Sequence, residues 1–390
     1  MPDLDTRFRS FGRVRAPELW PEIERREPSP ALGPPLRPRI VAGVVACLVA
    51  AAGFAFAERA LSGGRESSPR PGSPRTVGAS QAVQGEAVLG ASTPGALWVT
   101  TCTNCPPNLP AKQGELVHID PSSGRVIDSS AIDSPGDVAA SGDAAWVLDF
   151  LGGSISRVDA GADQVTSTTQ LTLPPGRQMA DGSFLPENVA VGEGAVWVGT
   201  ARGALVKVDP HTNSVEDTTA LPPETTGDIA AGAGGVWVAE GLLGLYRIDP
   251  QTGTVVDKIR ITRGQDVLSP SEVAVIGGDV VVSGGWSKPI TDETGVRDYQ
   301  STGDNAIVQI APASDSVGSM TDVGYTRFVE GDDGHLWIDT QHSAVRVSLS
   351  PIGLDASTRV ALPAPLLGVA GGRLWFQDSS KAIVSIAEHQ

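Results

Sequence analysis

The chain has 390 residues, of which 40% are hydrophobic and 5% aromatic, so it can build a large folded core. Its 45 Asp and Glu outnumber its 29 Lys and Arg, giving a net charge of −16. Beyond residue 39 there are 39 acidic residues against 21 basic ones, which argues against nucleic acid as a partner because phosphates demand a basic surface.

Residues 1–39 form a polar tail that contains eight Arg and six acidic residues. Leu19, Trp20 and Ile23 stand among these charges. Apolar and aromatic side chains in a short tail indicate a docking peptide that folds on a cytoplasmic regulator. A disordered tail near the membrane surface is the alternative, and the residues favour neither.

Residues 40–57 carry no charge, and 18 such residues are long enough to cross a bilayer. Arg37 and Arg39 precede them, so the positive-inside rule puts the N-terminus in the cytoplasm and the rest of the chain outside. We therefore predict a single-pass cell-membrane anchor. The alternatives are a signal peptide cleaved after Ala57 and a lipoprotein attachment site at Cys47, although the apolar run continues beyond that cysteine.

Residues 58–75 are rich in Pro, Gly and Ser and indicate an extended linker. From residue 76 to 390 one pattern repeats, a glycine-flanked apolar strand followed by an alternating strand that ends near Asp-Pro. Seven anchors spaced 38 to 56 residues apart carry it: Trp98, Trp146, Trp197, Trp237, Val281, Trp337 and Trp375. This period with several short strands is typical of propeller blades. The sequence predicts an all-β, seven-bladed β-propeller of four-stranded blades over residues 76–390.

The last repeat ends after its third strand, at residues 382–387. We expect residues 76–80 to supply the fourth strand and close the ring, which would remove an open sheet edge.

The connections differ between the two faces of the predicted disc. With the strands of each blade named a to d outward from the axis, the a–b and c–d turns are mostly short, and most long insertions fall in the b–c and d–a loops. Because long loops on a rigid scaffold often carry binding residues, we predict a binding site on the b–c/d–a face, with evolutionary drift as the alternative. The candidate ligand-binding residues are Trp286, Asp292, Glu293, Arg297, Asp298 and Tyr299 in blade 5 and His342 in blade 6.

Cys102 and Cys105 form a CxxC pair in a domain predicted to lie outside the cytoplasm. This indicates a local disulfide, with a redox role as the weaker alternative because the βαβ surroundings of a thioredoxin are missing. The five His are scattered, and the acids of blade 5 lack the spacing of a calcium loop. We predict no metal and no cofactor. No Ser-His-Asp elbow, phosphate loop or HExxH stretch occurs.

The repeated Gly-x-Val-Trp-Val strand and the Asp-Pro-x-Thr-Gly turn resemble the extracytoplasmic propellers of the YVTN and streptogramin-lyase-like group. This resemblance implies a seven-bladed propeller. Streptogramin B lyases of that group use a catalytic His with acidic magnesium ligands, a constellation that His342 alone does not supply. Residues 19–26, followed by the apolar run, are similar to leaders of actinobacterial membrane proteins related to anti-sigma factors, without their zinc-binding His and Cys.

We therefore predict a membrane-anchored extracytoplasmic propeller that binds or senses a protein or a small-molecule ligand, with no requirement for catalysis. One alternative is a lyase-like enzyme working at the loop face. The other is a transmembrane signalling protein whose cytoplasmic tail binds a regulator.

Overall fold

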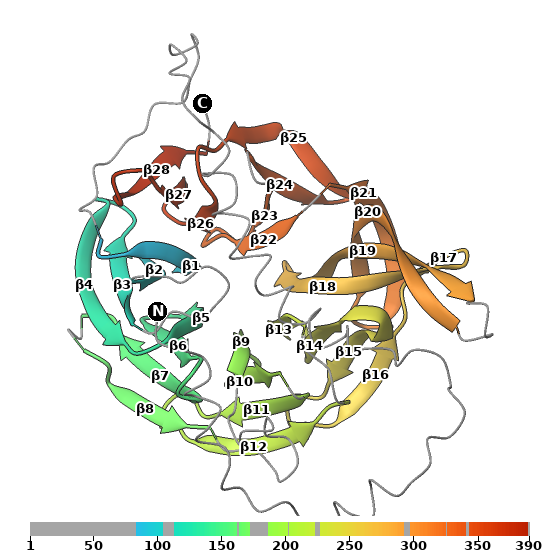
Figure 1. Cartoon of the computed structure of the whole chain (residues 1–390), viewed down its shortest axis with the longest axis horizontal. Coiled ribbons are helices and arrows are strands. Elements are labelled where there is room, and N and C mark those ends of the chain that lie inside the picture. The colour runs from blue at the N-terminus through green and yellow to red at the C-terminus, as the bar shows by residue number, and fades with distance from the viewer. Residues whose placement is uncertain are drawn as a thin grey trace, which may run out of the picture. The chain divides into compact units, whose positions relative to one another are not determined.

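The structure, a computed structural model, describes residues 83–103, 113–161, 164–171, 186–201, 203–222, 227–291, 297–324, 326–340 and 343–388. These residues form seven antiparallel sheets arranged in a ring (Figure 1). The all-β, seven-bladed prediction is confirmed. The predicted tail, membrane span and linker lie outside the described residues, and within those residues no helix has the length and apolarity needed to cross a membrane.

The first three blades have four strands each. Blade 1 contains β1 (Glu86–Thr93), β2 (Ala96–Cys102), β3 (Gly114–Asp120) and β4 (Arg125–Ile132). Blade 2 contains β5 (Pro135–Ser141), β6 (Ala144–Asp149), β7 (Ser154–Asp159) and β8 (Ser167–Gln170). Blade 3 contains β9 (Pro186–Gly192), β10 (Ala195–Thr200), β11 (Ala204–Val208) and β12 (Val215–Ala220).

The remaining blades vary more in strand number and length. Blade 4 contains β13 (Ile229–Gly232), β14 (Gly235–Glu240), the 3₁₀ helix η3 (Gly241–Leu243), β15 (Gly244–Ile248) and β16 (Val255–Ile259). Blade 5 contains β17 (Thr262–Arg263), β18 (Asp266–Ile276), β19 (Asp279–Thr291), β20 (Arg297–Ala311) and β21 (Ser316–Val323). Blade 6 contains β22 (Arg327–Glu330), β23 (Leu336–Asp339), β24 (Ser343–Leu349) and β25 (Ile352–Ala361), and blade 7 contains β26 (Leu366–Val369), β27 (Arg373–Gln377) and β28 (Ile383–Ala387).

The burial of the strands explains the repeated sequence pattern. Every side chain of β2, β10 and β14 is buried, whereas the outermost strand β4 alternates between exposed and covered residues. A b strand is covered by a neighbouring blade on each face, so it requires a continuous apolar run. The seven predicted anchors all lie on b strands, and all of them are buried.

The hydrophobic core is a ring of seven clusters, each built from two adjacent blades. Between blades 2 and 3, for example, Trp146 packs in one cluster with Val196. The cluster that joins Leu97 of blade 1 to Trp375 of blade 7 closes the ring. Stability is therefore distributed over blade interfaces, as in other repeat proteins.

The inner strands are crowded around the axis, and small residues make this possible. A Cβ atom on Gly90 would lie 2.3 Å from the carbonyl oxygen of Leu367 in blade 7. A Cβ atom on Gly192 would lie 2.2 Å from the carbonyl oxygen of Ala231 in blade 4. A side chain at either glycine would force two blades apart.

Blade 7 has three strands among the described residues. The backbone N–H of Val83 donates to the carbonyl of Lys381 at 3.1 Å, so the chain enters blade 1 beside the start of β28. An antiparallel fourth strand would end at this point. Residues 76–80 lie outside the described residues, and their role as that strand stays a prediction.

Candidate functional site

The predicted blade 5 insertion is mostly strand rather than irregular loop. β19 and β20 continue as a pair from Ser287↔Ser301 to Thr291↔Arg297. The neighbouring strands stop earlier: β18 pairs with β19 only as far as Ser287, and β21 pairs with β20 only from Asn305. We call residues 288–291 and 297–304 the blade 5 arm. It is a two-stranded ribbon that extends beyond the sheet.

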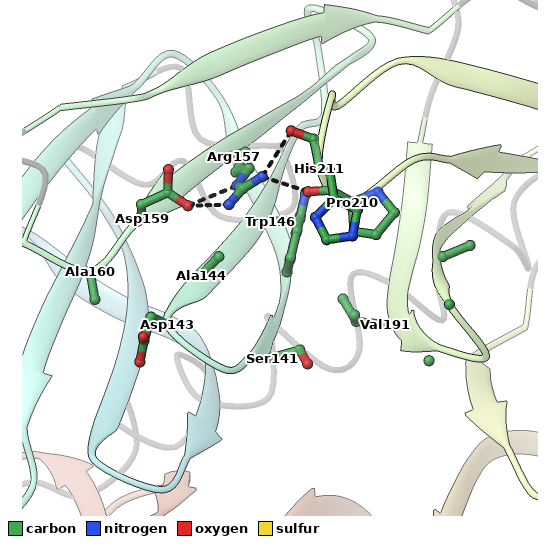
Figure 2. A pocket seen from close by; sticks show the side chains of 13 residues that line it. Ser141, Asp143, Ala144, Trp146, Arg157, Asp159, Ala160, Val191, Pro210 and His211 are labelled. Carbon is green, nitrogen blue, oxygen red and sulfur yellow. Dashed lines mark hydrogen bonds and ion pairs between the residues drawn. The ribbon is translucent and has the colours of Figure 1, made fainter.

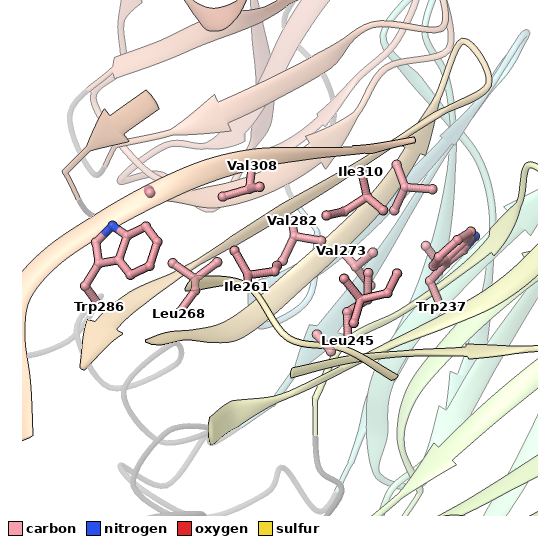
Figure 3. Packing of buried hydrophobic residues seen from close by; sticks show 14 residues of the cluster. Trp237, Leu245, Ile261, Leu268, Val273, Val282, Trp286, Val308 and Ile310 are labelled. Carbon is pink, nitrogen blue, oxygen red and sulfur yellow. The ribbon is translucent and has the colours of Figure 1, made fainter. Parts of the chain in front are cut away.

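The structure corrects the prediction for Trp286, which is fully buried with 0% exposure. It belongs to the cluster between blades 4 and 5, at the far end from Trp237 (Figure 3). The guanidinium of Arg263 lies 4.5 Å from the centre of its ring. The hydroxyl of Thr302 donates to its carbonyl at 3.1 Å. Trp286 therefore fixes the base of the blade 5 arm and is not available to a ligand.

Two of the predicted residues lie on the arm with described side chains. Tyr299 is half-buried, and its hydroxyl accepts a hydrogen bond from Nη2 of Arg260 at 2.7 Å. Asp298 is exposed, and its Oδ1 accepts the N–H of Tyr299. Arg297 begins β20, opposite Thr291.

The structure does not test the other predicted residues. Asp292, Glu293, His342 and Cys105 lie outside the described residues. Cys102 ends β2 and is buried, at 4% exposure. Its bond to Cys105 stays a prediction.

The arm has an open strand edge, and side-chain contacts at its base hold it in place. Within the described residues β20 has no strand on its outer side before Asn305, so that edge of the arm can pair with another strand. Lys288 and Ile290 are exposed, the latter at 36%. At the base, Arg263 also pairs with Asp322 at 2.7 Å. A two-stranded ribbon alone is marginally stable, and these contacts hold it in one direction.

A second group of polar residues, which the sequence analysis did not identify, links successive blades at their inner strands or, for Asp339, at the end of the b strand β23. Each side chain bonds a backbone group of the next blade. The bonds are Val189 N–H to Asp137 (2.9 Å), Asn188 to the Gly227 carbonyl (2.9 Å), Val273 N–H to Asp228 (3.0 Å), Phe328 N–H to Glu272, and Leu366 N–H to Asp339 (2.9 Å). We call these five residues the inner belt. The belt joins blades 2 to 7 in order.

Three belt carboxyls hold protons more tightly than usual. Desolvation raises the pKa of Asp137 to about 7, with a further contribution from the charge of Asp228. Desolvation raises the pKa of Asp228 to about 6, and it raises that of Glu272 to about 8 with the charge of Asp228 adding to it. The backbone N–H donors oppose these shifts because they stabilise the ionised form.

The sequence does contain a signal for the belt. Four inner strands share an acidic or amide residue immediately before a Val-Ala or Ile-Ala pair, at Asp137, Asn188, Asp228 and Glu272. A polar residue at one fixed position of an otherwise apolar strand needs a partner when it is covered. Within the described part of the chain, no group of three or more His, Cys, Asp or Glu side chains is placed to hold a metal ion.

Comparisons with known proteins establish the fold. No protein-family model matches the chain, and no curated protein sequence matches it. Among solved structures it is similar to the WD40 domain of coronin from Toxoplasma gondii, with a TM-score of 0.54 and 10% identity over 82% of this chain and 85% of that one. BamB from Moraxella catarrhalis gives a TM-score of 0.43 and 14% identity over 76% of this chain and 85% of that one. WD40 domains are propellers, so the chain shares its β-propeller architecture with the coronin domain.

Proposed function

We propose that this protein is a membrane-anchored, extracytoplasmic propeller that binds a protein partner through the blade 5 arm. The partner contributes an extended segment, which adds as a further strand to the outer edge of β20. The single observation that carries this proposal is the length of β19 and β20 beyond both neighbouring strands.

The arm has the two properties that strand addition requires. Its outer edge, at residues 298–303, has no neighbouring strand among the described residues and is open to an incoming strand. It is also preorganised, because Arg260 holds Tyr299 and Arg263 lies on Trp286 at its base. A rigid edge reduces the entropy that a partner must lose on binding.

The location and the family remain proposals that rest on the sequence. The apolar run at residues 40–57 and its arginine flank support an anchor with the propeller outside the cell. The repeated Trp strand and Asp-Pro turn support a place in the YVTN and streptogramin-lyase-like group. Reporter fusions at residue 20 and at the C-terminus test the orientation, with cytoplasm expected for the first and outside for the second.

Photo-crosslinking in intact cells tests the arm. A photoreactive residue at Gln300 of the full chain should give one discrete protein adduct. The control position is Val256 on β16, which is 55% exposed and lies on a different blade. We expect no such adduct from Val256.

A second change separates specific docking from chance proximity. Ile290→Asp removes an exposed apolar contact of the arm and should reduce the Gln300 adduct by about tenfold, because burying such a side chain contributes about 1.5 kcal/mol or more. Val256→Asp is the matched control and should leave the adduct unchanged. Equal adducts from Gln300 and Val256, or an adduct insensitive to Ile290→Asp, would reject the arm as the docking element.

A further inference from the structure

Carboxyl groups of the neighbouring blades hold the inner edge of β18 in blade 5. Among the described residues, β17 covers this edge only at residues 266–267. Further along, the backbone N–H of Val273 donates to Asp228 of blade 4 at 3.0 Å. The N–H of Val275 donates to the carboxyl of Glu330 in blade 6. Side chains from both sides therefore take the place of a further strand on this edge.

The contact between blades 5 and 6 is reciprocal. Oε2 of Glu272 in blade 5 accepts the N–H of Phe328 in blade 6. In the opposite direction, Glu330 of blade 6 accepts the N–H of Val275 in blade 5. With Asp228, three carboxyls meet on one short stretch of β18. We call Asp228, Glu272 and Glu330, together with the N–H groups that they accept, the β18 joint.

The joint has more acidic groups than cations around it. Among the described residues, the other charged groups that interact with its carboxyls are Arg327 and Asp339 of blade 6 and Asp137 of blade 2. Nη2 of Arg327 lies 3.1 Å from Oδ2 of Asp339, and the same nitrogen donates to the carbonyl of Leu366. The one guanidinium is therefore paired with Asp339, and the joint carboxyls have no cation of their own among these neighbours.

The surroundings of the joint disfavour the ionised carboxyls. Desolvation raises the pKa of Glu272 to about 8, with the charges of Asp228 and Asp339 adding to it and Arg327 opposing it. Desolvation also raises the pKa of Glu330 to about 7 and that of Asp228 to about 6. Asp228 and Glu272 are half-buried, and Glu330 has an exposed surface, so all three can exchange protons with the solvent.

We propose that the β18 joint is a pH-sensitive switch that opens as the pH rises and frees the inner strand of blade 5 from blades 4 and 6. The protonated carboxyls fill the joint without charge and still accept the backbone N–H groups. The ionised carboxyls are hydrated better in the open form, where their pKa values return to the ordinary range. The closed form is therefore favoured most at acidic pH, and this preference is lost as the pH rises through the folded pKa values. The switch is independent of the docking proposed for the arm.

Hydrogen–deuterium exchange of the full chain in detergent micelles tests the switch. The reporter is a peptide that contains β18, because the N–H groups of Val273 and Val275 exchange when the joint opens. The control is a peptide that contains β2 of blade 1, a blade that the inner belt does not include. Exchange at pH 6, 7 and 8 is divided by that of the unfolded chain at the same pH, because the exchange chemistry itself becomes faster as the pH rises.

We expect the protection of the β18 peptide to fall by at least about tenfold from pH 6 to pH 8, since one carboxyl that is protonated only in the closed form contributes up to about tenfold per pH unit. The protection of the β2 peptide should change much less. A loss that is equal in both peptides would show that the whole ring unfolds, and equal protection of β18 at pH 6 and pH 8 would show that no joint opens. Either result would overturn the proposal.

Two variants separate the charge of the joint from its hydrogen bonds. In Glu272→Gln and in Glu330→Gln the amide oxygen can still accept the backbone N–H, but the side chain no longer ionises. Each variant should therefore reduce the pH-dependent loss of protection severalfold, and the use of two keeps the test valid if one fails to fold. Asp217→Asn, which changes an exposed acid on β12, is the matched control and should behave as wild type. A wild-type pH dependence in the folded Gln variants would also reject the switch.

Discussion

Blades 4 and 2 both place an Arg of strand c opposite the Trp of strand b, but the hydrogen-bond and ion-pair partners of these side chains differ between the two blades. Arg247 pairs in register with Trp237 in blade 4, as Arg157 does with Trp146 in blade 2. In both blades the Trp is buried in an interface cluster. The Trp therefore has the same place in the apolar interior of both blades.

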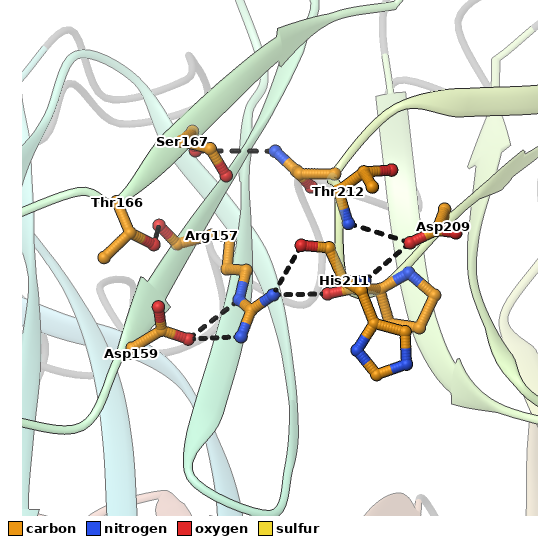
Figure 4. A network of polar contacts seen from close by, with 9 residues as sticks. Arg157, Asp159, Thr166, Ser167, Asp209, His211 and Thr212 are labelled. Atoms are coloured by element: carbon orange, nitrogen blue, oxygen red, sulfur yellow. Dashed lines mark hydrogen bonds and ion pairs between the residues drawn. The ribbon is translucent and has the colours of Figure 1, made fainter.

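The two blades differ in the polar contacts of the Trp and Arg side chains. In blade 4 the Trp Nε1–H donates to Gly232 at 3.0 Å, and Asp315 of blade 5 pairs with Arg247 at 2.8 Å across the interface. In blade 2 the Arg partner is Asp159 of its own strand (Figure 4). Packing is thus shared by the repeats, while the polar contacts of the Trp and Arg in a single blade can change without loss of the fold.

The largest expected effect tests the shared part of this comparison. Trp237→Ala and Trp146→Ala should each lower the free energy of unfolding by about 3–5 kcal/mol, because each removes a buried aromatic side chain from a blade interface. Urea titration followed by circular dichroism measures both. A small effect in only one of the two would mean that the interiors are not equivalent.

The inner belt allows an intermediate test, which concerns pH. In the folded protein the pKa of Asp137 in blade 2 is raised to about 7, and the pKa of Asp228, just before the inner strand of blade 4, is raised to about 6. Both values lie above the pKa of an Asp in an unfolded chain. As the pH rises, the unfolded chain loses these protons before the folded protein does. The contribution of these two groups to the free energy of unfolding is therefore largest below about pH 4, and it decreases as the pH rises to about 6 for Asp228 and about 7 for Asp137. Each group contributes a slope below about 1.4 kcal/mol per pH unit.

Asn substitution separates the two belt residues. Asp228→Asn should flatten the decrease in stability mainly between pH 4 and 6, and Asp137→Asn should flatten it up to pH 7. Urea titrations at pH 5, 6 and 7 measure this, while the turn residues with lowered pKa values, such as Asp209 and Asp249, act only at more acidic pH. A slope that is identical in wild type and both variants would show that the belt carboxyls are ionised throughout.

The repeat made the fold predictable, and interruptions of the repeat made the sites hard to predict. Trp98 and Trp197 identify b strands because both faces of these strands are covered. The same reasoning failed at Trp286, because strand pairing continues past the usual strand length and buries a residue expected in a loop. Tyr299 was correctly placed in the blade 5 extension, although its bond to Arg260 joins residues whose contact no local pattern encodes.

The belt, and the pocket lined by Asp143 of blade 2 and His211 of blade 3, depend on contacts between blades (Figure 2). The position of Asp137 in its strand is visible in the sequence, but its acceptor role depends on Val189 in the next blade. Likewise, the pocket requires the turn at Asp143 and the turn at His211 to meet across an interface. Sequence periodicity gives the period of the repeat and not the atoms that face each other between its copies.

The smallest expected effect concerns the hydrogen bond of the indole N–H in blade 4. Phe in place of Trp retains an aromatic ring and removes the indole N–H, so Trp237→Phe loses the hydrogen bond to Gly232 and leaves its carbonyl without that donor. In Trp146→Phe the N–H that is removed had no partner among the described residues. Since both variants lose similar ring area, the difference between them isolates the hydrogen bond, and Trp237→Phe should be less stable than Trp146→Phe by about 1 kcal/mol. Urea titrations of the two variants at one pH measure the difference. Equal costs would show that the indole bond adds nothing in blade 4, and the contrast between the two blades would then rest on their arginine partners alone.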